Sequence, residues 1–194
     1  AIFERSSFGE PPSLVLLTLH GAHGPTKLAL STLTQIEVTA SAPSSARSTL
    51  IPGALAIDRI AARSRDGTEV RAWVVRLRDV PFDGKAPGLL NGYGGFNIVQ
   101  TPGFLRSIHA FLERGGIYVL ANLRGGGEYG EAWHRNGMLS HKQNVFDDAI
   151  AVAEALLAKH IVSPQRLAVL GGSNGGLLVG ALITQRPDLF RAAV

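Results

Sequence analysis

Short apolar runs recur through the first fifty residues, at 14–19, 27–33 and 35–39, and glycine-rich or polar clusters separate them. Closely spaced runs of this length are typical of antiparallel strands. Residues 41–48 (SAPSSARS) are small and polar and include a proline, a composition that indicates a linker or loop. The pattern therefore predicts an all-β module over residues 1–50 and a boundary near residue 50.

Beyond that boundary the pattern changes to strands that alternate with helices. Asp66-Gly67 lies between apolar stretches at 57–63 and 70–77, which predicts a β-hairpin, and this dipeptide favours a type I′ turn. Strands are then expected at 87–90, 117–122 and 166–170, and helices at 104–114, 144–160 and 174–184. Such alternation predicts a parallel, twisted sheet with flanking helices and right-handed crossovers.

The predicted helix at 144–160 carries signals at both its start and its sides. Asn144 is suited to cap its first turn, and Asp147 and Asp148 suit the positive end of the helix dipole. One face carries an apolar stripe, formed by Phe146, Ile150, Ala153 and Leu157. We expect this stripe to pack on the sheet.

The stretch LAVLGGSNGG at 167–176 combines an apolar strand, a glycine-flanked serine and the start of a helix. Gly171, Ser173 and Gly175 form the G-x-S-x-G pattern of a nucleophile elbow, in which the serine occupies a strained turn between strand and helix. The helix that starts at Asn174 would direct its unpaired N–H groups toward any oxyanion formed there. The alternative is a glycine-rich turn with an unreactive serine.

Composition excludes several classes of function. The chain is 45% hydrophobic and 18% charged, as in ordinary soluble domains, and no apolar run has the length of a membrane span. The net charge of +4 comes from scattered basic residues without a cluster, which argues against nucleic-acid binding. Cysteine is absent, so disulfides and thiolate metal sites are excluded. We expect a soluble, cytoplasmic protein, and a periplasmic or secreted one is left open.

Two further motifs resemble ligand sites but lack the required partners. His20 and His23 have a spacing that could bind a metal, yet no carboxylate or third histidine lies nearby in the sequence. The run RGGGE at 124–128 resembles a phosphate loop, but no Lys-Ser pair follows it. We therefore assign no metal and no cofactor.

Four blocks in the same order and spacing resemble the prolyl oligopeptidase family: NGYGGFN at 91–97, ANLRGGGEYGEAWH at 121–134, KQNVFDDAI at 142–150 and GGSNGGLLV at 171–179. The resemblance is strong over residues 55–194. It implies an α/β-hydrolase fold preceded by a few β-propeller-like strands. Residues 1–50 would be the C-terminal part of the propeller-like domain, and residues 51–194 the N-terminal part of a truncated peptidase catalytic domain.

The resemblance also implies roles for single residues. Ser173 would attack the carbonyl of the peptide bond that follows a proline and form an acyl-enzyme. The backbone N–H of Asn174 and the hydroxyl of Tyr93 would bind the oxyanion, and Phe96 would line the pocket for the proline ring. The alternatives are a tyrosine packed in a glycine turn and a core phenylalanine. In the family the RGGGE segment is structural and lies beside the active site.

The sequence contains no residue suited to complete a catalytic triad in the order Ser, Asp, His. All six histidines precede Ser173, and the one acidic residue after it, Asp188, follows too soon. We expect a truncated chain that is nearly inactive alone, belonging to a monomeric peptidase for short proline-containing peptides. The alternatives are oligopeptidase B-like cleavage after basic residues, a non-catalytic hydrolase-like binding module, and an esterase or lipase.

Overall fold

The computed structural model describes residues 2–10, 13–20, 27–32 and 53–194. Its N-terminal part is a three-stranded antiparallel sheet in the order β1 (Ile2–Arg5), β2 (Ser13–His20) and β3 (Lys27–Thr32). Strands β2 and β3 match two of the predicted apolar runs, whereas β1 was not predicted. The expected strand at 35–39, the linker at 41–48 and His23 lie outside the described residues. The boundary near residue 50 stays a prediction.

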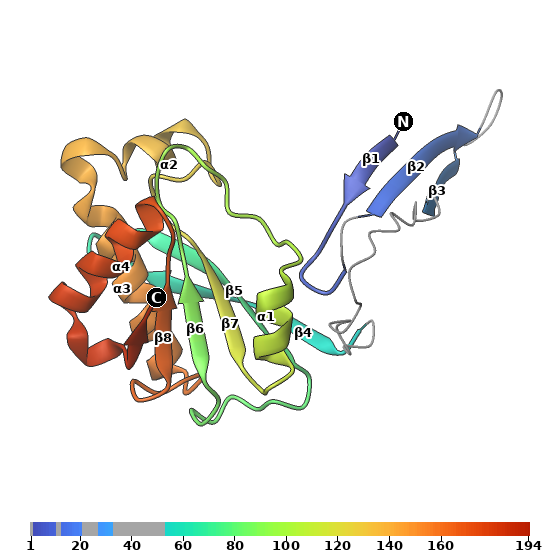
Figure 1. Ribbon diagram of the computed structural model, residues 1–194. Coiled ribbons are helices and arrows are strands. Elements are labelled where there is room, and N and C mark those ends of the chain that lie inside the picture. Colours follow the sequence, from blue (N-terminus) through green and yellow to red (C-terminus); the bar gives the residue numbers. More distant parts are fainter. Residues whose placement is uncertain (1, 11–12, 21–26, 33–52) are drawn as a thin grey trace.

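A six-stranded sheet organises the rest of the chain (Figure 1). Its order is β4-β5-β7-β6-β8-β9. The strands are β4 (Leu55–Arg63), β5 (Glu69–Leu77), β6 (Gly88–Asn91), β7 (Ile117–Asn122), β8 (Leu167–Leu170) and β9 (Ala192–Ala193). Strands β7, β6, β8 and β9 are parallel, as expected, while the β4–β5 hairpin joins β7 in antiparallel fashion, so the sheet is mixed.

The β4–β5 hairpin forms as predicted, but its turn is not of type I′. That turn needs a positive φ at both central residues, and only Gly67 (φ 88°) has one, whereas Asp66 does not. The loop instead closes through two backbone bonds, from Gly67 N–H to Ser64 O (2.8 Å) and from Ser64 N–H to Thr68 O (2.8 Å). The carboxylate of Asp66 accepts a hydrogen bond from the N–H of Thr68 at 3.0 Å, which stabilises a turn in which Asp66 does not have a positive φ.

Helices cover both faces of the sheet (Figure 1). Helix α1 (Arg106–Leu112) lies on one face, and α3 (Gln143–Ala158) and α4 (Asn174–Gln185) lie on the other. A short helix α2 (Glu131–Arg135) and a 3₁₀ turn η1 (Leu139–His141) precede α3, and a second 3₁₀ turn η2 (Pro187–Leu189) follows α4.

Helix α3 differs from the prediction at its cap. Its N-cap is Lys142, without a side-chain cap bond, and Asn144 instead donates to the carbonyl of Asn136 at 2.9 Å. The prediction that Asn144 caps the helix was therefore wrong, because η1 runs directly into α3 and Val145 N–H already bonds Lys142 O. The predicted stripe does pack in the core: Phe146 and Ala153 are buried there, and Ile150 and Leu157 are half-buried against it. The helix also buries residues that were not predicted, namely Val145, Ala149, Val152 and Leu156.

Each face of the sheet has its own apolar core. The larger core lies under α3 and α4, and its fully buried members include Val119, Val152, Leu156, Leu178 and Leu182. The smaller one lies under α1 and gathers Phe8, Val75, Leu112, Tyr118 and Leu120. Phe8 therefore packs against the α/β unit, and its carbonyl lies 2.5 Å from Nε2 of His109. Both cores together hold the sheet as a rigid platform for the loops at the carboxyl ends of β6 and β8.

Candidate active site

Ser173 lies at a strained turn between β8 and α4, with its side chain exposed. Its φ of 55° and ψ of −120° fall in a region that non-glycine residues rarely adopt. The two glycines around it are required by space. A Cβ on Gly171 would overlap the carbonyl oxygen of Gly175, and a Cβ on Gly175 would lie 3.0 Å from the carbonyl oxygen of Gly92. The local geometry is that of a nucleophile elbow.

The structure brings Tyr93 and Asn174 to the same place. Asn174 is the first residue of α4, so no carbonyl of the preceding helical turn is available to its N–H. Its side-chain Nδ2 donates to the carbonyl oxygen of Tyr93 at 2.6 Å. Tyr93 follows β6, the strand next to β8, and its Cδ2 would lie 3.9 Å from a Cβ on Gly175. The loop after β6 and the elbow after β8 therefore adjoin at one edge of the sheet.

Phe96 lies in the same loop but points into solvent, with 74% of its surface exposed. The alternative that it is a core phenylalanine was therefore wrong, and its role at a proline pocket stays a prediction. Its φ of 54° and the φ of 57° at Asn97 place both residues in the left-handed region. This part of the loop is thus held in an unusual backbone conformation.

Glu128 and Asn122 anchor the loop that carries Phe96. Glu128 Oε1 accepts the N–H of Gln100 at 2.9 Å, and Asn122 Nδ2 donates to the carbonyl of Gln100 at 2.9 Å. Glu128 Oε2 is buried without a hydrogen-bond partner among the described residues. Burial raises the pKa of the Glu128 carboxyl. Neither residue was singled out from the sequence, because their contacts reach across the fold.

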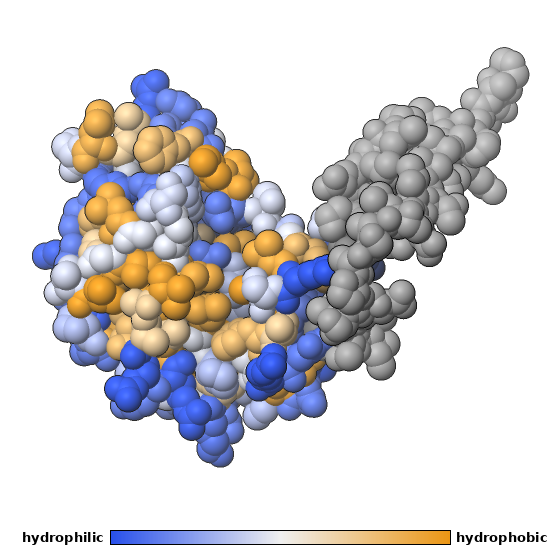
Figure 2. Space-filling view, viewed as in Figure 1, coloured by the Kyte–Doolittle hydropathy of each residue, from blue (hydrophilic) through white to orange (hydrophobic). Residues whose placement is uncertain are grey.

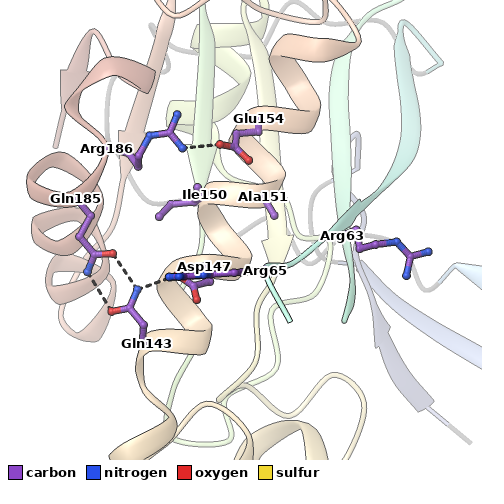
Figure 3. A pocket seen from close by; sticks show the side chains of 9 residues that line it. All are labelled: Arg63, Arg65, Gln143, Asp147, Ile150, Ala151, Glu154, Gln185 and Arg186. Carbon is purple, nitrogen blue, oxygen red and sulfur yellow. Dashed lines mark hydrogen bonds and ion pairs between the residues drawn. The ribbon is translucent and has the colours of Figure 1, made fainter. Parts of the chain in front are cut away.

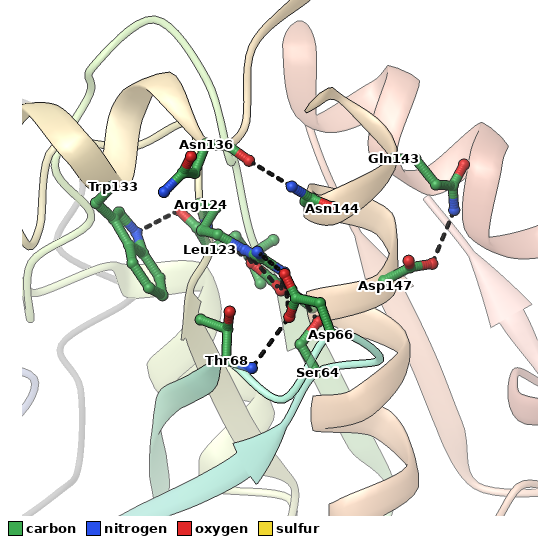
Figure 4. A network of polar contacts seen from close by, with 11 residues as sticks. Ser64, Asp66, Thr68, Leu123, Arg124, Trp133, Asn136, Gln143, Asn144 and Asp147 are labelled. Carbon is green, nitrogen blue, oxygen red and sulfur yellow. Dashed lines mark hydrogen bonds and ion pairs between the residues drawn. The ribbon is translucent and has the colours of Figure 1, made fainter. Parts of the chain in front are cut away.

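A buried polar network surrounds Arg124 (Figure 4). The guanidinium of Arg124 donates hydrogen bonds to Asp148, Ser64 and Asp66. The backbone N–H of Arg124 donates to Asp148 Oδ2 at 3.1 Å. Although desolvation opposes ionisation, the hydrogen bonds that Arg124 donates to Asp148 and Asp66 keep its pKa above the usual value. The network links the loop after β7, helix α3 and the hairpin turn. Asp148, a charged residue among the apolar residues on the buried face of α3, is the sequence signal that could have revealed it.

The glycine run after Arg124 packs against the Tyr93 loop instead of forming a phosphate loop. Gly125 has a φ of 86°, and a Cβ on it would lie 2.6 Å from the carbonyl oxygen of Gly94. Its N–H donates to Trp133 O at 3.0 Å, and its carbonyl oxygen lies 2.8 Å from Nδ1 of His134. The structure thus places the start of RGGGE against the Tyr93 loop.

Lys142 is a further residue of this region that sequence reasoning missed. Its Nζ donates to the carbonyl of Gly94 at 2.7 Å and to Asn174 Oδ1 at 3.3 Å. Burial lowers the pKa of the Lys142 ammonium. In the sequence it appeared only as the first letter of a family block, since nothing local predicts contacts with residues 32 and 48 positions away.

A pocket of about 400 Å³ lies away from the elbow, between α3, α4 and the end of the β4–β5 hairpin (Figure 3). Its walls contain the Arg186–Glu154 ion pair and a pair of hydrogen bonds between Gln143 and Gln185. Neither Ser173 nor Tyr93 lines it. This pocket is therefore separate from the candidate active site.

The surface around α4 and the last strand is partly apolar (Figure 2). Leu177, Ile183 and Val194 are 56%, 41% and 74% exposed. Within the part of the chain that the structure describes, no helix combines the length and apolar character needed to cross a membrane. In the same ranges, no group of three or more His, Asp or Glu side chains could hold a metal ion.

Comparison with known proteins gives one consistent family. Residues 102–194 match the model of the prolyl oligopeptidase family. A prolyl endopeptidase of Dictyostelium discoideum is 54% identical over 132 residues, which cover 67% of this chain and 17% of that protein. The chain spans about a fifth of the length of the curated relatives it matches.

Solved structures agree. A prolyl endopeptidase structure matches all of this chain and 26% of its own, with a TM-score of 0.81 and 42% identity. Oligopeptidase B from Leishmania major matches 99% of this chain and 25% of its own, with a TM-score of 0.82 and 29% identity. The predicted fold class is confirmed: the mixed sheet with its flanking helices is that of an α/β-hydrolase in proteins that also carry a β-propeller. The elbow, the adjoining tyrosine loop and these matches together show that the chain belongs to the prolyl oligopeptidase family.

Proposed function

We propose that this chain supplies the nucleophile and the oxyanion-binding groups of a serine endopeptidase that cleaves short peptides on the carboxyl side of proline. The observation that carries the proposal is the exposed Ser173 at a positive-φ turn, with Asn174 and Tyr93 beside it. Strain of this kind in a surface turn is characteristic of functional sites.

The chemistry follows from this arrangement. Ser173 Oγ would attack the carbonyl carbon of the proline residue while a histidine takes its proton, and the same histidine would protonate the leaving amine of the next residue. The tetrahedral oxyanion would accept hydrogen bonds from the N–H of Asn174 and the hydroxyl of Tyr93. Water would then hydrolyse the acyl-enzyme and release Ser173.

The general base and the triad aspartate are proposed to come from sequence outside this chain. All six histidines precede Ser173. His109 and His134 are already engaged with the carbonyls of Phe8 and Gly125. The relatives are about five times longer than the matched region, which leaves room for both partners. A full-length sequence without a later Asp and His would instead support a non-catalytic hydrolase-like module.

Cleavage after proline is favoured over cleavage after basic residues. The solved prolyl endopeptidase shares 42% of its residues with this chain, compared with 29% for oligopeptidase B. Phe96, an exposed flat ring in the loop after Tyr93, could form an apolar wall for a proline ring. The same tyrosine loop argues against a simple esterase or lipase.

The test uses the full-length protein and three substrates: a proline peptide amide, an arginine peptide amide and a simple ester. We expect preference for the proline amide, no cleavage by Ser173→Ala, and a loss of about 10²- to 10³-fold in kcat for Tyr93→Phe. Ser107→Ala, an exposed serine on α1, is the matched control and should retain full activity. Peptide cleavage that persists in Ser173→Ala would refute the mechanism, and preference for the arginine amide would refute the specificity.

A further inference from the structure

Three hydrogen bonds link Lys142 to Asn174 and to the Tyr93 loop, which carry the two oxyanion donors of the proposed mechanism. Lys142 Nζ donates to Gly94 O (2.7 Å) and to Asn174 Oδ1 (3.3 Å). Asn174 Nδ2 in turn donates to Tyr93 O (2.6 Å). We propose that Lys142 is a positioning residue that holds the Tyr93 loop and the first residue of α4 in the geometry needed for oxyanion binding. The proposal rests on the peptidase function proposed above.

The donor and acceptor roles in these hydrogen bonds allow only one orientation of the Asn174 side-chain amide. A lysine ammonium only donates, and a backbone carbonyl only accepts. Oδ1 must therefore face Lys142, and Nδ2 must face Tyr93. Without the ammonium, the amide would lose the partner that determines its orientation. The tie between the elbow and the Tyr93 carbonyl would then loosen.

The second contact of Lys142 fixes the residue after Tyr93. Gly94 has a φ of 60°, and a Cβ there would overlap Val145 on α3. A Cβ on Gly95 would lie 2.6 Å from Asn174 Nδ2. The loop is thus packed directly on α3 and the elbow, and the carbonyls of both Tyr93 and Gly94 are held by side chains. Tyr93 has little freedom to shift away from Ser173.

The ammonium of Lys142 is held by hydrogen bonds and a ring contact instead of an ion pair. The side chain is half-buried, and burial lowers the pKa of its ammonium. Among the described residues, Lys142 forms no ion pair, and its Nζ lies 6.0 Å from the centroid of the Phe146 ring, at the outer limit of a cation–π contact. A half-buried cation without an anionic partner is unfavourable for folding. The contacts of this cation with Gly94 O and Asn174 Oδ1 give it a role in holding the two segments together.

The matched comparison is Lys142→Met and Lys159→Met in the full-length protein. Lys142 and Lys159 flank opposite ends of α3, and Lys159 is exposed. With a proline peptide amide, we expect Lys142→Met to lower kcat about 10- to 100-fold while KM changes less than about twofold, because a small displacement of catalytic groups has effects of this size. Lys159→Met should leave both parameters unchanged. An unchanged kcat in Lys142→Met would overturn the proposal.

A double-mutant cycle separates positioning from simple stabilisation. In a Tyr93→Phe background the hydroxyl is already absent, so Lys142→Met should lower kcat by a clearly smaller factor than in the wild type. Equal factors in both backgrounds would overturn the proposal. Should Lys142→Met fail to fold, Asn174→Asp keeps an acceptor for Lys142 and removes the donor to Tyr93 O. It should also lower kcat, and full activity would overturn the proposal.

The two proposals fail in different ways. If Ser173→Ala retains cleavage, the proposed function is wrong whatever Lys142 does. If Ser173 is essential and Lys142→Met keeps its kcat, only the positioning role is wrong.

Discussion

The guanidinium of Arg124 and the carboxylate of Asp148 form a buried two-point ion pair between the loop after β7 and helix α3. Arg124 Nε lies 2.9 Å from Oδ2, and Nη2 lies 2.6 Å from Oδ1. The two side chains are 4% and 0% exposed. Removing one partner of such a pair leaves a buried charge without compensation. The loop that supports the Tyr93 region therefore depends on a contact inside the core.

Asp148→Asn should lower the free energy of unfolding by about 3 kcal/mol, because Arg124 would keep its charge and retain only the partly exposed Asp66 as an anionic partner. Asp147→Asn is the matched control, since Asp147 is the neighbouring carboxylate and its side chain bonds only Gln143 among the described residues. Denaturant unfolding of the full-length protein measures both. Similar midpoints for the two variants would contradict this assignment.

Acid should weaken the hairpin contact of the same network. The hydrogen bond from Arg124 is the main cause that lowers the pKa of Asp66 from 3.8 to about 2. Because the folded pKa is below the unfolded one, the stabilisation is present above about pH 4 and is lost as the pH falls toward 2. Asp66→Asn should flatten the melting temperature over this range, whereas the exposed Asp79→Asn should not. Partial exposure of Asp66 keeps the effect modest.

Glu128 should show the opposite pH dependence. Burial raises its pKa above the ordinary 4.5, so protonation favours the folded state. Its contribution is present below about pH 4.5 and is lost as the pH rises through the folded pKa. Glu128→Gln keeps an oxygen for the N–H of Gln100 and should melt at a higher temperature than the wild type at neutral pH. If the two proteins have the same melting curve at neutral pH, the buried carboxylate of Glu128 does not destabilise the fold.

The elbow glycines can be tested with one neighbouring pair. Gly171→Ala should reduce both folding yield and peptidase activity, because its Cβ would overlap the backbone of Gly175. Gly172→Ala should be tolerated, since nothing lies within 4 Å of the Cβ it would add. Expression level and kcat of the two variants provide the measurement. A tolerated Gly171→Ala would mean that the turn can open.

Phe96→Ala should separate a binding role from a packing role. Because Phe96 is 74% exposed, its loss should leave the melting temperature unchanged. If the ring contacts the substrate proline, kcat/KM for a proline peptide should fall about tenfold, in line with the burial energy of an aromatic side chain. Leu139→Ala, at an 82% exposed position, is the control. An unchanged kcat/KM would remove Phe96 from the proposed binding site.

The elements with the clearest local patterns were predicted most accurately. Strand β7 has the predicted bounds, and β8 and α4 differ from theirs by a single residue at one end. The cap of α3 and the hairpin turn were predicted wrongly. In both cases another contact satisfied the backbone N–H groups. At the start of α3, η1 continues directly into the helix, and in the turn the Asp66 carboxylate accepts the N–H of Thr68. Short α2 and η1 were not predicted, because segments of three to five residues have too few positions to show a period.

The amino-acid sequence by itself determined the alternation of strands and helices, the glycines that permit a strained serine, and the family to which the blocks point. These depend on neighbours along the chain. Tertiary structure alone decided that Asn174 bonds Tyr93, 81 residues away, that Arg124 meets Asp148, and that Phe96 faces solvent. Such contacts arise where separate loops meet at one edge of a sheet. Local periodicity cannot specify them, because it constrains which face a residue takes and not which distant residue it meets.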